Sequence, residues 1–178
     1  LDNYCDIVLV GDSMANVLYG LKDINKITLE NIIQHTLSVK QGIKKSLLVV
    51  DMPKNSYNDY KKAEKNAQLI IKTTGCDAVK LESNNKNFKI IEKLVDKKIP
   101  VMGHIGYTPQ FKKKFKIEGD TAAKANKLLN EALLIEKAGA FSIVLECISP
   151  ETSRLITTKL KIPTIGIGSS SYCDGQVL

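Results

Sequence analysis

Six short apolar runs along the chain each end in a charged or polar side chain. Each run holds about four to six apolar, mostly β-branched residues without polar alternation, which is typical of a strand buried in a parallel sheet. The runs occupy residues 6–13, 46–53, 78–83, 99–106, 142–149 and 162–170. The first five deliver, in chain order, Asp12, Asp51, Glu82, His104 and Glu146.

The segments between these runs show helical periodicity. Apolar residues that recur at intervals of three and four predict helices, and Gly75 and Gly139 follow two of them at the position typical of a helix end. The predicted helices cover residues 28–41, 58–74, 88–95, 121–138 and 150–160. Residues 1–4 resemble the tail of a further helix, and residues 107–120 form the longest irregular segment, typical of a lid or of disorder.

The repeated strand–helix order predicts an α/β fold with a parallel sheet or a (β/α)₈ barrel. Six strands in 178 residues are too few for a closed barrel of eight strands, which needs about 250 residues. Two alternatives therefore stay open: a barrel without its first strand and its C-terminal unit, or an open doubly wound sheet. Since no linker or internal repeat interrupts the chain, residues 1–178 are predicted to form a single domain.

The polar strand ends predict a catalytic site. Ligands bind at the carboxyl ends of the strands in parallel α/β folds, so that edge would collect four carboxylates and an imidazole. A single Asp after a strand is more often a helix cap or a turn residue, but five successive strand ends are harder to explain that way. Buried carboxylates repel each other unless a cation neutralises them, and Mg²⁺ suits one or two carboxylates with an oxygen-rich substrate.

Composition excludes several classes of protein. The net charge is +7, yet Arg154 is the only arginine, aromatic residues make up 6% and Trp is absent, which argues against a nucleic-acid partner. The lysines Lys112–Lys114 cluster in one loop, where they are either solvated or attract an anionic substrate. No apolar run reaches the roughly 18 residues of a membrane span, so no membrane association is expected.

Cysteine usage indicates a reducing compartment. The four cysteines are far apart and form no C-x-x-C pair, which predicts reduced thiols and a cytoplasmic protein. They are Cys5, Cys76, Cys147 and Cys173.

Taken together, the strand-end motifs resemble the ketopantoate hydroxymethyltransferase family. The motifs are VGDS (10–13), DMP (51–53), KLE (80–82), GHIGYTPQ (103–110), LEC (145–147) and IGIGSSSYCDGQVL (165–178). The resemblance implies a Mg²⁺-dependent (β/α)₈ barrel that extends beyond both ends of this chain and assembles as a homo-oligomer, a decamer. It also implies transfer of a hydroxymethyl group from 5,10-methylenetetrahydrofolate to 3-methyl-2-oxobutanoate, a step of pantothenate and coenzyme A biosynthesis.

The resemblance assigns roles to individual residues. Asp12, Asp51 and Glu82 match the metal ligands of the family, and Glu146 matches its general base. The residues that match those holding the 2-oxo acid are Asp12, Ser13, Asp51 and Lys80. The chain departs from the family at Met14-Ala15-Asn16, at Ser83-Asn84-Asn85 and in the lysine-rich loop 110–120.

The spacing and the burial of these residues bear on their roles. Lys80 and Glu82 are two residues apart on one strand and therefore face the same side, which must be the barrel interior if a site is to form. Burial would raise the pKa of Glu146 and a nearby Mg²⁺ would lower it, and the sequence leaves the balance open. His104 is an auxiliary candidate, either as a hydrogen-bond donor to the substrate or as a structural residue.

Two other functions compete with this interpretation. One is another Mg²⁺-dependent, enolate-forming barrel enzyme of the phosphoenolpyruvate mutase and isocitrate lyase group, which leaves GHIGYTPQ unexplained. The other is a non-catalytic barrel scaffold, which leaves the buried carboxylates Asp12, Asp51, Glu82 and Glu146 unexplained, because buried charges destabilise a fold unless a ligand compensates them.

Overall fold

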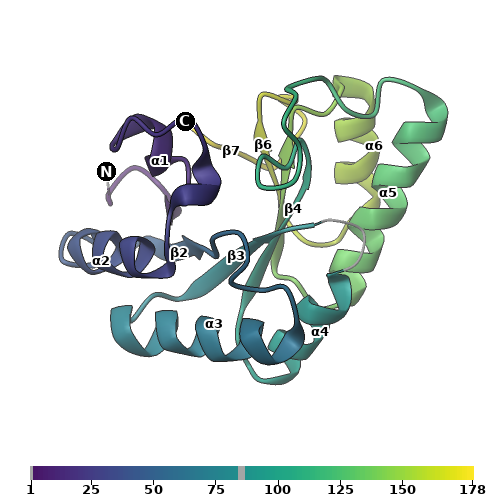
Figure 1. The fold of residues 1–178 in the computed structure, drawn as a ribbon. Helices are drawn as coiled ribbons and strands as arrows, with labels where there is room; N and C mark the ends of the chain where they lie inside the picture. The colour runs from purple at the N-terminus through teal and green to yellow at the C-terminus, as the bar shows by residue number, and fades with distance from the viewer. Residues whose placement is uncertain (1, 84–86) are drawn as a thin grey trace.

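A curled parallel sheet with helices along its outer face makes up the computed structural model, which describes residues 2–83 and 87–178 (Figure 1). The strands are β1 (Ile7–Val10), β2 (Leu47–Asp51), β3 (Ala78–Glu82), β4 (Val101–Gly106), β5 (Ser142–Glu146), β6 (Thr164–Ile167) and β7 (Gly175–Gln176). Their spatial order is β1-β2-β3-β4-β5-β6-β7, and each neighbouring pair is parallel. Each strand thus pairs with its neighbour in sequence.

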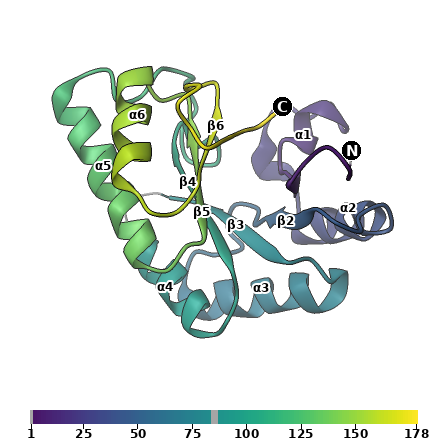
Figure 2. The ribbon, with the colours of Figure 1, turned by 180° about the vertical axis from the view of Figure 1, so that it is seen from behind.

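This strand order decides between the two predicted architectures. A doubly wound sheet reverses its strand order at a switch point, and the described sheet has no such reversal. It winds in one direction as a barrel does (Figures 1 and 2), and the described strands β1 and β7 do not pair with each other, so the sheet is not closed. The described part of the chain is therefore a half-barrel, and the doubly wound alternative is wrong.

The five predicted helices form within a few residues of their expected bounds. The five predicted helices are α2 (Leu29–Lys40), α3 (Tyr60–Thr74), α4 (Phe88–Asp96), α5 (Ala122–Lys137) and α6 (Pro150–Lys159). The structure also has a short helix α1 (Met14–Val17) and a 3₁₀ turn η1 (Ile24–Lys26). Side-chain caps fix three starts: Thr28 for α2, Asp59 for α3 and Thr121 for α5. Gly75 ends α3 with a left-handed φ of 65°.

The structure corrects the prediction at both ends of the chain. Residues 2–4 form a turn instead of a helix tail, and Leu1 lies outside the described residues. The sequence did not predict α1, η1 and β7, because elements of two to four residues are too short to show periodicity.

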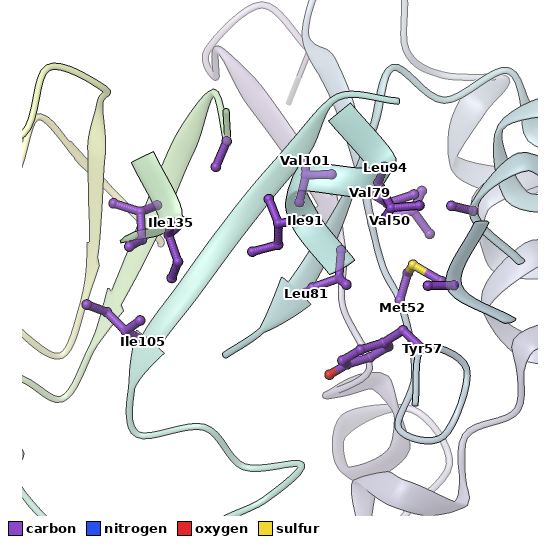
Figure 3. Close-up of a cluster of buried hydrophobic side chains, with 14 of the residues drawn as sticks. Val50, Met52, Tyr57, Val79, Leu81, Ile91, Leu94, Val101, Ile105 and Ile135 are labelled. Atoms are coloured by element: carbon purple, nitrogen blue, oxygen red, sulfur yellow. The ribbon is translucent and has the colours of Figure 1, made fainter. Parts of the chain in front are cut away.

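The main hydrophobic core lies between the outer face of the sheet and the helices. Val50 of β2, Val79 and Leu81 of β3 pack there with Ile91 and Leu94 of α4, all of them buried (Figure 3). This layer anchors the middle strands, whose last residues carry the candidate site.

The inner face of the sheet holds a second, smaller apolar cluster. Its buried members are Val49, Ala78, Met102 and Val144, one from each of β2 to β5. Side chains two residues apart on a strand share a face, so the next inward positions are Asp51, Lys80, His104 and Glu146. The inner apolar cluster is therefore the floor beneath the polar strand ends.

The structure also describes the cysteines and the apolar character of the helices. Cys76, Cys147 and Cys173 are free thiols and buried, whereas Cys5 is half-buried. Within the described residues, no helix combines the length and the apolar character needed to cross a membrane.

Candidate active site

The parallel register brings the predicted polar residues together at the carboxyl edge of the sheet. Asp51 of β2 is in register with Lys80 of β3, and Glu82 of β3 is in register with His104 of β4. Asp12 follows β1 by two residues, and Glu146 is the last residue of β5. Solvent has little access to the site, because five of its residues are each at most 6% exposed: Asp12, Asp51, Lys80, Glu82 and His104.

A buried ion pair lies at the centre of the site. The Nζ atom of Lys80 is 2.6 Å from Oδ1 of Asp51. The backbone N–H of Asp12 donates to the other oxygen of Asp51, Oδ2, at 3.3 Å. Burial would lower the pKa of Lys80, but the charges of Asp51 and Glu82 outweigh it and raise that pKa, so the lysine stays protonated.

Gln110 closes the site from the loop after β4, and the sequence did not single it out. Its Nε2 donates to Oδ2 of Asp12 at 2.8 Å and to the carbonyl of Met52 at 3.0 Å. Its backbone N–H donates to Oε2 of Glu82 at 3.0 Å, and the hydroxyl of Tyr57 donates to its side-chain oxygen. Gln110 thereby fixes one oxygen each of Asp12 and Glu82.

His104 lies between two carboxylates. Its Nε2 is 3.0 Å from Oε2 of Glu146, and its Nδ1 is 3.9 Å from Oε1 of Glu82. The shorter approach lacks hydrogen-bond alignment, because neither ring nitrogen has a hydrogen-bond partner among the described residues. Burial, followed by the charge of Lys80, holds the pKa of His104 well below its usual value, so the imidazole is neutral.

Burial raises the pKa of three carboxyl groups in the site. Desolvation and the charge of Asp51 raise the pKa of Asp12 to about 7 against the opposing charge of Lys80. Desolvation raises the pKa of Glu82 to about 9, with Asp12 and Asp51 adding to it. Desolvation also raises the pKa of Glu146 to about 7. The carboxyl groups thus resist ionisation chiefly because they are buried, and the charge of Lys80 offsets this only in part.

This excess of carboxylates fits a divalent cation. Among the described residues, no three His, Cys, Asp or Glu side chains are placed to hold a metal ion between them. Mg²⁺ does not require three, since it takes one or two protein carboxylates and completes its shell with water and substrate oxygens. Asp12 and Asp51 are coupled through the N–H of Asp12 and through their charges, and they are the pair that fits such an ion.

The remaining predicted residues lie beside this cluster. Ser13 is the N-cap of α1, where its exposed side chain makes no capping hydrogen bond. In the altered sequence after it, Met14 and Ala15 are buried, and Asn16 donates to the carbonyl of Leu21 at 2.6 Å. Asn84 and Asn85, which depart from the family pattern after Glu82, lie outside the described residues.

The motif GHIGYTPQ carried a signal for the residue that was missed. Gln110 is the last residue of that motif, which stood out only through its resemblance to a family. Tyr57 had no comparable signal, because it lies in an irregular segment between β2 and α3. Both residues form hydrogen bonds between parts of the chain that are distant in sequence. Gln110 and Asp12 are 98 residues apart, and Tyr57 and Gln110 are 53 residues apart.

Comparison with known proteins identifies the relatives of this chain. The sequence model of the family described as Ketopantoate hydroxymethyltransferase matches residues 1–178. A 3-methyl-2-oxobutanoate hydroxymethyltransferase of Pelagibacter ubique is 51% identical over 178 residues, covering 100% of this chain and 69% of the relative. One of Clostridioides difficile is 47% identical over 180 residues, covering 98% of this chain and 66% of the relative. The chain thus spans about two thirds of the length of these relatives.

A solved structure supports the barrel winding. The crystal structure of 2,3-dimethylmalate lyase, a member of the PEP mutase/isocitrate lyase superfamily, superposes with a TM-score of 0.69. The match covers 95% of this chain and 61% of that one at 12% sequence identity. At this identity the likeness concerns the fold alone.

Proposed function

Because this chain belongs to the ketopantoate hydroxymethyltransferase family, we propose that it transfers a hydroxymethyl group from 5,10-methylenetetrahydrofolate to 3-methyl-2-oxobutanoate. The product is 2-dehydropantoate, an intermediate of pantothenate and coenzyme A biosynthesis. The observation that carries the proposal is the buried cluster of carboxylates around Lys80, on a chain that the family model matches from end to end. Such a cluster is costly to a fold unless a cation and an anionic substrate compensate it.

In this proposal, Asp12 and Asp51 bind the Mg²⁺ ion, and Glu82 binds it directly or through its water ligands. The chemistry that bound Mg²⁺ supplies is stabilisation of the negative charge that develops when the 2-oxo acid becomes an enolate. Lys80 pairs with the anionic end of the substrate, and Ser13 contributes a hydroxyl at the turn after β1. The buried setting supports these roles, because electrostatic interactions are stronger in a dry site.

Glu146 is the general base of the proposed reaction. Its pKa of about 7 suits a base that works near neutral pH, and its side chain is 18% exposed and so reachable by substrate. His104 is neutral, and its Nε2 lies 3.0 Å from Oε2 of Glu146, so a change in the alignment of the ring would let it donate to that carboxylate.

Each bond that forms in this reaction is matched by a bond that breaks. The proton on C3 of the 2-oxo acid passes to Glu146, and the electron pair left behind forms a carbon–carbon bond to the one-carbon unit of the donor. The bonds between that carbon and the folate nitrogens break, and the nitrogens recover protons. Water supplies the hydroxyl group, so no oxidant or reductant is required.

The proposal extends to the whole protein. The greater length of the relatives supports a complete (β/α)₈ barrel as one domain that includes residues 1–178. Because seven strands are described, one more strand, which we place before β1, would complete the barrel, and the expected additional C-terminal strand is not needed. We further propose a cytoplasmic homo-oligomer, a decamer, as the family resemblance implies.

A label-transfer assay tests the proposed reaction. Tetrahydrofolate loaded with ¹³C-formaldehyde is incubated with the protein, Mg²⁺ and 3-methyl-2-oxobutanoate, and the expected result is ¹³C in a new hydroxymethyl group on C3. Lyase or mutase activity on other 2-oxo acids without label transfer would favour an enzyme of the PEP mutase and isocitrate lyase group. Absence of any turnover with the intact protein would favour the scaffold.

A further inference from the structure

A basic hollow of about 530 Å³ lies beside the mouth of the candidate site and has no role in the proposed chemistry. It lies between the loop after β4 and the N-terminal half of α5. Two glutamates, Glu118 and Glu131, and six lysines line it. The lysines are Lys112, Lys113, Lys114, Lys116, Lys124 and Lys127.

Two of the six lysines already have partners. Lys112 donates to the carbonyl of Gly106 at 2.7 Å and is paired with Glu118 at 2.8 Å, so it anchors the loop. Lys124 is paired with Asp120 at 2.6 Å. The other four, Lys113, Lys114, Lys116 and Lys127, are exposed and form no ion pair with any described residue. The hollow therefore presents a cluster of free positive charges.

The walls of the hollow are continuous with the ends of the strands that carry the site. The backbone N–H of Glu118 donates to the carbonyl of Cys147, the residue after Glu146, at 2.8 Å. The hydroxyl of Ser83, the residue after Glu82, donates to Glu131. The charge of Lys112 is close enough to contribute to the low pKa of His104. The hollow thus borders the ends of the strands that carry Glu82 and Glu146.

We propose that this hollow binds a chain of carboxylates carried by the one-carbon donor, namely the glutamate tail of the folate. The inference rests on the proposed function, because that function supplies a donor with such a tail. Flexible lysine ammonium groups suit carboxylates spaced along a chain, whereas phosphate recognition favours arginine forks, and Arg154 does not line the hollow. Each added glutamate brings one more negative charge within reach of Lys113, Lys114 or Lys116.

Two variants with equal loss of charge test this inference. The first replaces three unpaired lysines of the hollow: Lys113→Gln, Lys114→Gln, Lys116→Gln. The second is the control, with three exposed lysines at the opposite edge of the sheet, near the starts of β2, β3 and β6: Lys44→Gln, Lys72→Gln, Lys161→Gln. Both lower the net charge by the same amount, so they separate a local site from a general attraction.

Calorimetry with free penta-γ-glutamate is the first readout and requires no turnover. At low salt the wild-type protein and the control variant should bind the peptide with similar affinity. The hollow variant should bind it about tenfold more weakly, the combined effect of about three exposed ion pairs. Binding should weaken as salt shortens the screening length to about 10 Å at 0.1 M. No binding by the wild-type protein, or equal weakening in both variants, would overturn the inference.

Kinetics with two donors is the second readout. In the wild-type protein and the control variant, the donor with five glutamates should have a lower KM than the donor with one, and in the hollow variant this preference should shrink by about tenfold. Equal KM values for the two donors in the wild-type protein at low salt would refute binding of the glutamate tail in the hollow, and the proposed function would be unaffected. Transfer from neither donor would refute the proposed function, and with it the premise of the inference, even if the peptide binds.

Discussion

At the scale of single residues, the pair of Lys80 and Asp51 governs the charge of the site. Both side chains are buried and their charged atoms are 2.6 Å apart. Breaking a buried pair by removing one partner typically costs about 3–5 kcal/mol, because the other charge is left uncompensated. Oδ2 of Asp51 also accepts from the backbone N–H of Asp12 at 3.3 Å, so this hydrogen bond links the two candidate metal ligands Asp12 and Asp51.

Asp51→Asn should therefore abolish most of the Mg²⁺-dependent binding of 3-methyl-2-oxobutanoate. The variant keeps the shape of the side chain but removes the charge that would hold the cation. Calorimetry with and without Mg²⁺ measures the effect, and Asp77→Asn is the matched control, because Asp77 caps the N–H of Leu48 at the opposite edge of the sheet. Unchanged affinity and unchanged Mg²⁺ dependence in Asp51→Asn would make Asp51 a structural residue only.

Much of the residue cluster could be predicted from sequence, since each of Asp12, Asp51, Glu82, His104 and Glu146 follows an apolar run. Gln110 could not be derived that way, because it reaches Asp12 from an irregular loop 98 residues further along the chain. The pKa of Glu146 also needed the structure. The sequence left burial and a nearby Mg²⁺ as two opposing effects, and the structure supplies the first, since burial raises that pKa to about 7. The opposing effect of Mg²⁺ stays a prediction.

At the scale of secondary-structure elements, Gly106 brings β4 and β5 together at the site. Its φ is 93°, in the region that favours glycine, and a Cβ atom there would lie 2.1 Å from the carbonyl oxygen of Glu146. The absence of a side chain lets the N–H of Tyr107 donate to that carbonyl at 2.8 Å. Gly106 thus sets the position of the backbone that carries the proposed base.

Gly106→Ala should destabilise the protein by about 2–4 kcal/mol, through backbone strain and the clash with Glu146. It should also lower activity in the fraction that remains folded, because β5 must shift. Urea unfolding and activity measurements provide the two readouts. Gly42→Ala is the control, since its nearest contact would be an ordinary 3.6 Å. Equal stability of the two variants would show that β4 and β5 can separate without cost.

Most elements could be predicted because their signals are local. The five longer helices show periodicity and caps, and six of the strands are continuous apolar runs. The two-residue strand β7 carries no such run, since it forms by pairing of Gly175 and Gln176 with Ile165 and Gly166. Strand order is likewise a tertiary property, which explains why the sequence left a barrel and a doubly wound sheet both open.

At the scale of the whole molecule, the buried carboxyl groups make stability depend on pH. The pKa values of Asp12 and Glu146 are raised to about 7 and that of Glu82 to about 9, from ordinary values of 3.8 for Asp and 4.5 for Glu. Above about pH 4.5 the folded state therefore holds more protons than the unfolded state. Stability from these groups is fully present below about pH 4 and is lost as pH rises through 7 to 9.

Mg²⁺ should reverse this loss, because it binds the ionised carboxylates of the folded state. At ten to a hundred times its Kd, it should add about 1–3 kcal/mol to the free energy of unfolding. The gain should be larger at pH 8.5 than at pH 6, where protons compete with the ion. Thermal unfolding with Mg²⁺ or with EDTA at both pH values measures it. An equal shift in Tm at both pH values, or none, would contradict a metal site built from these groups.

Proton exchange at C3 of 3-methyl-2-oxobutanoate is the most direct test of the proposed active site. Followed by ¹H NMR in D₂O with Mg²⁺ and no folate, the wild-type protein should exchange this proton, more slowly as pH falls below about 7. Glu146→Gln should slow the exchange by about 10²–10⁴-fold while retaining Mg²⁺-dependent binding of the 2-oxo acid. Glu151→Gln, an exposed glutamate in the first turn of α6, should exchange at the wild-type rate. Exchange at that rate in Glu146→Gln, or none in the wild-type protein, would contradict the assignment of Glu146 as the base of an enolate-forming site.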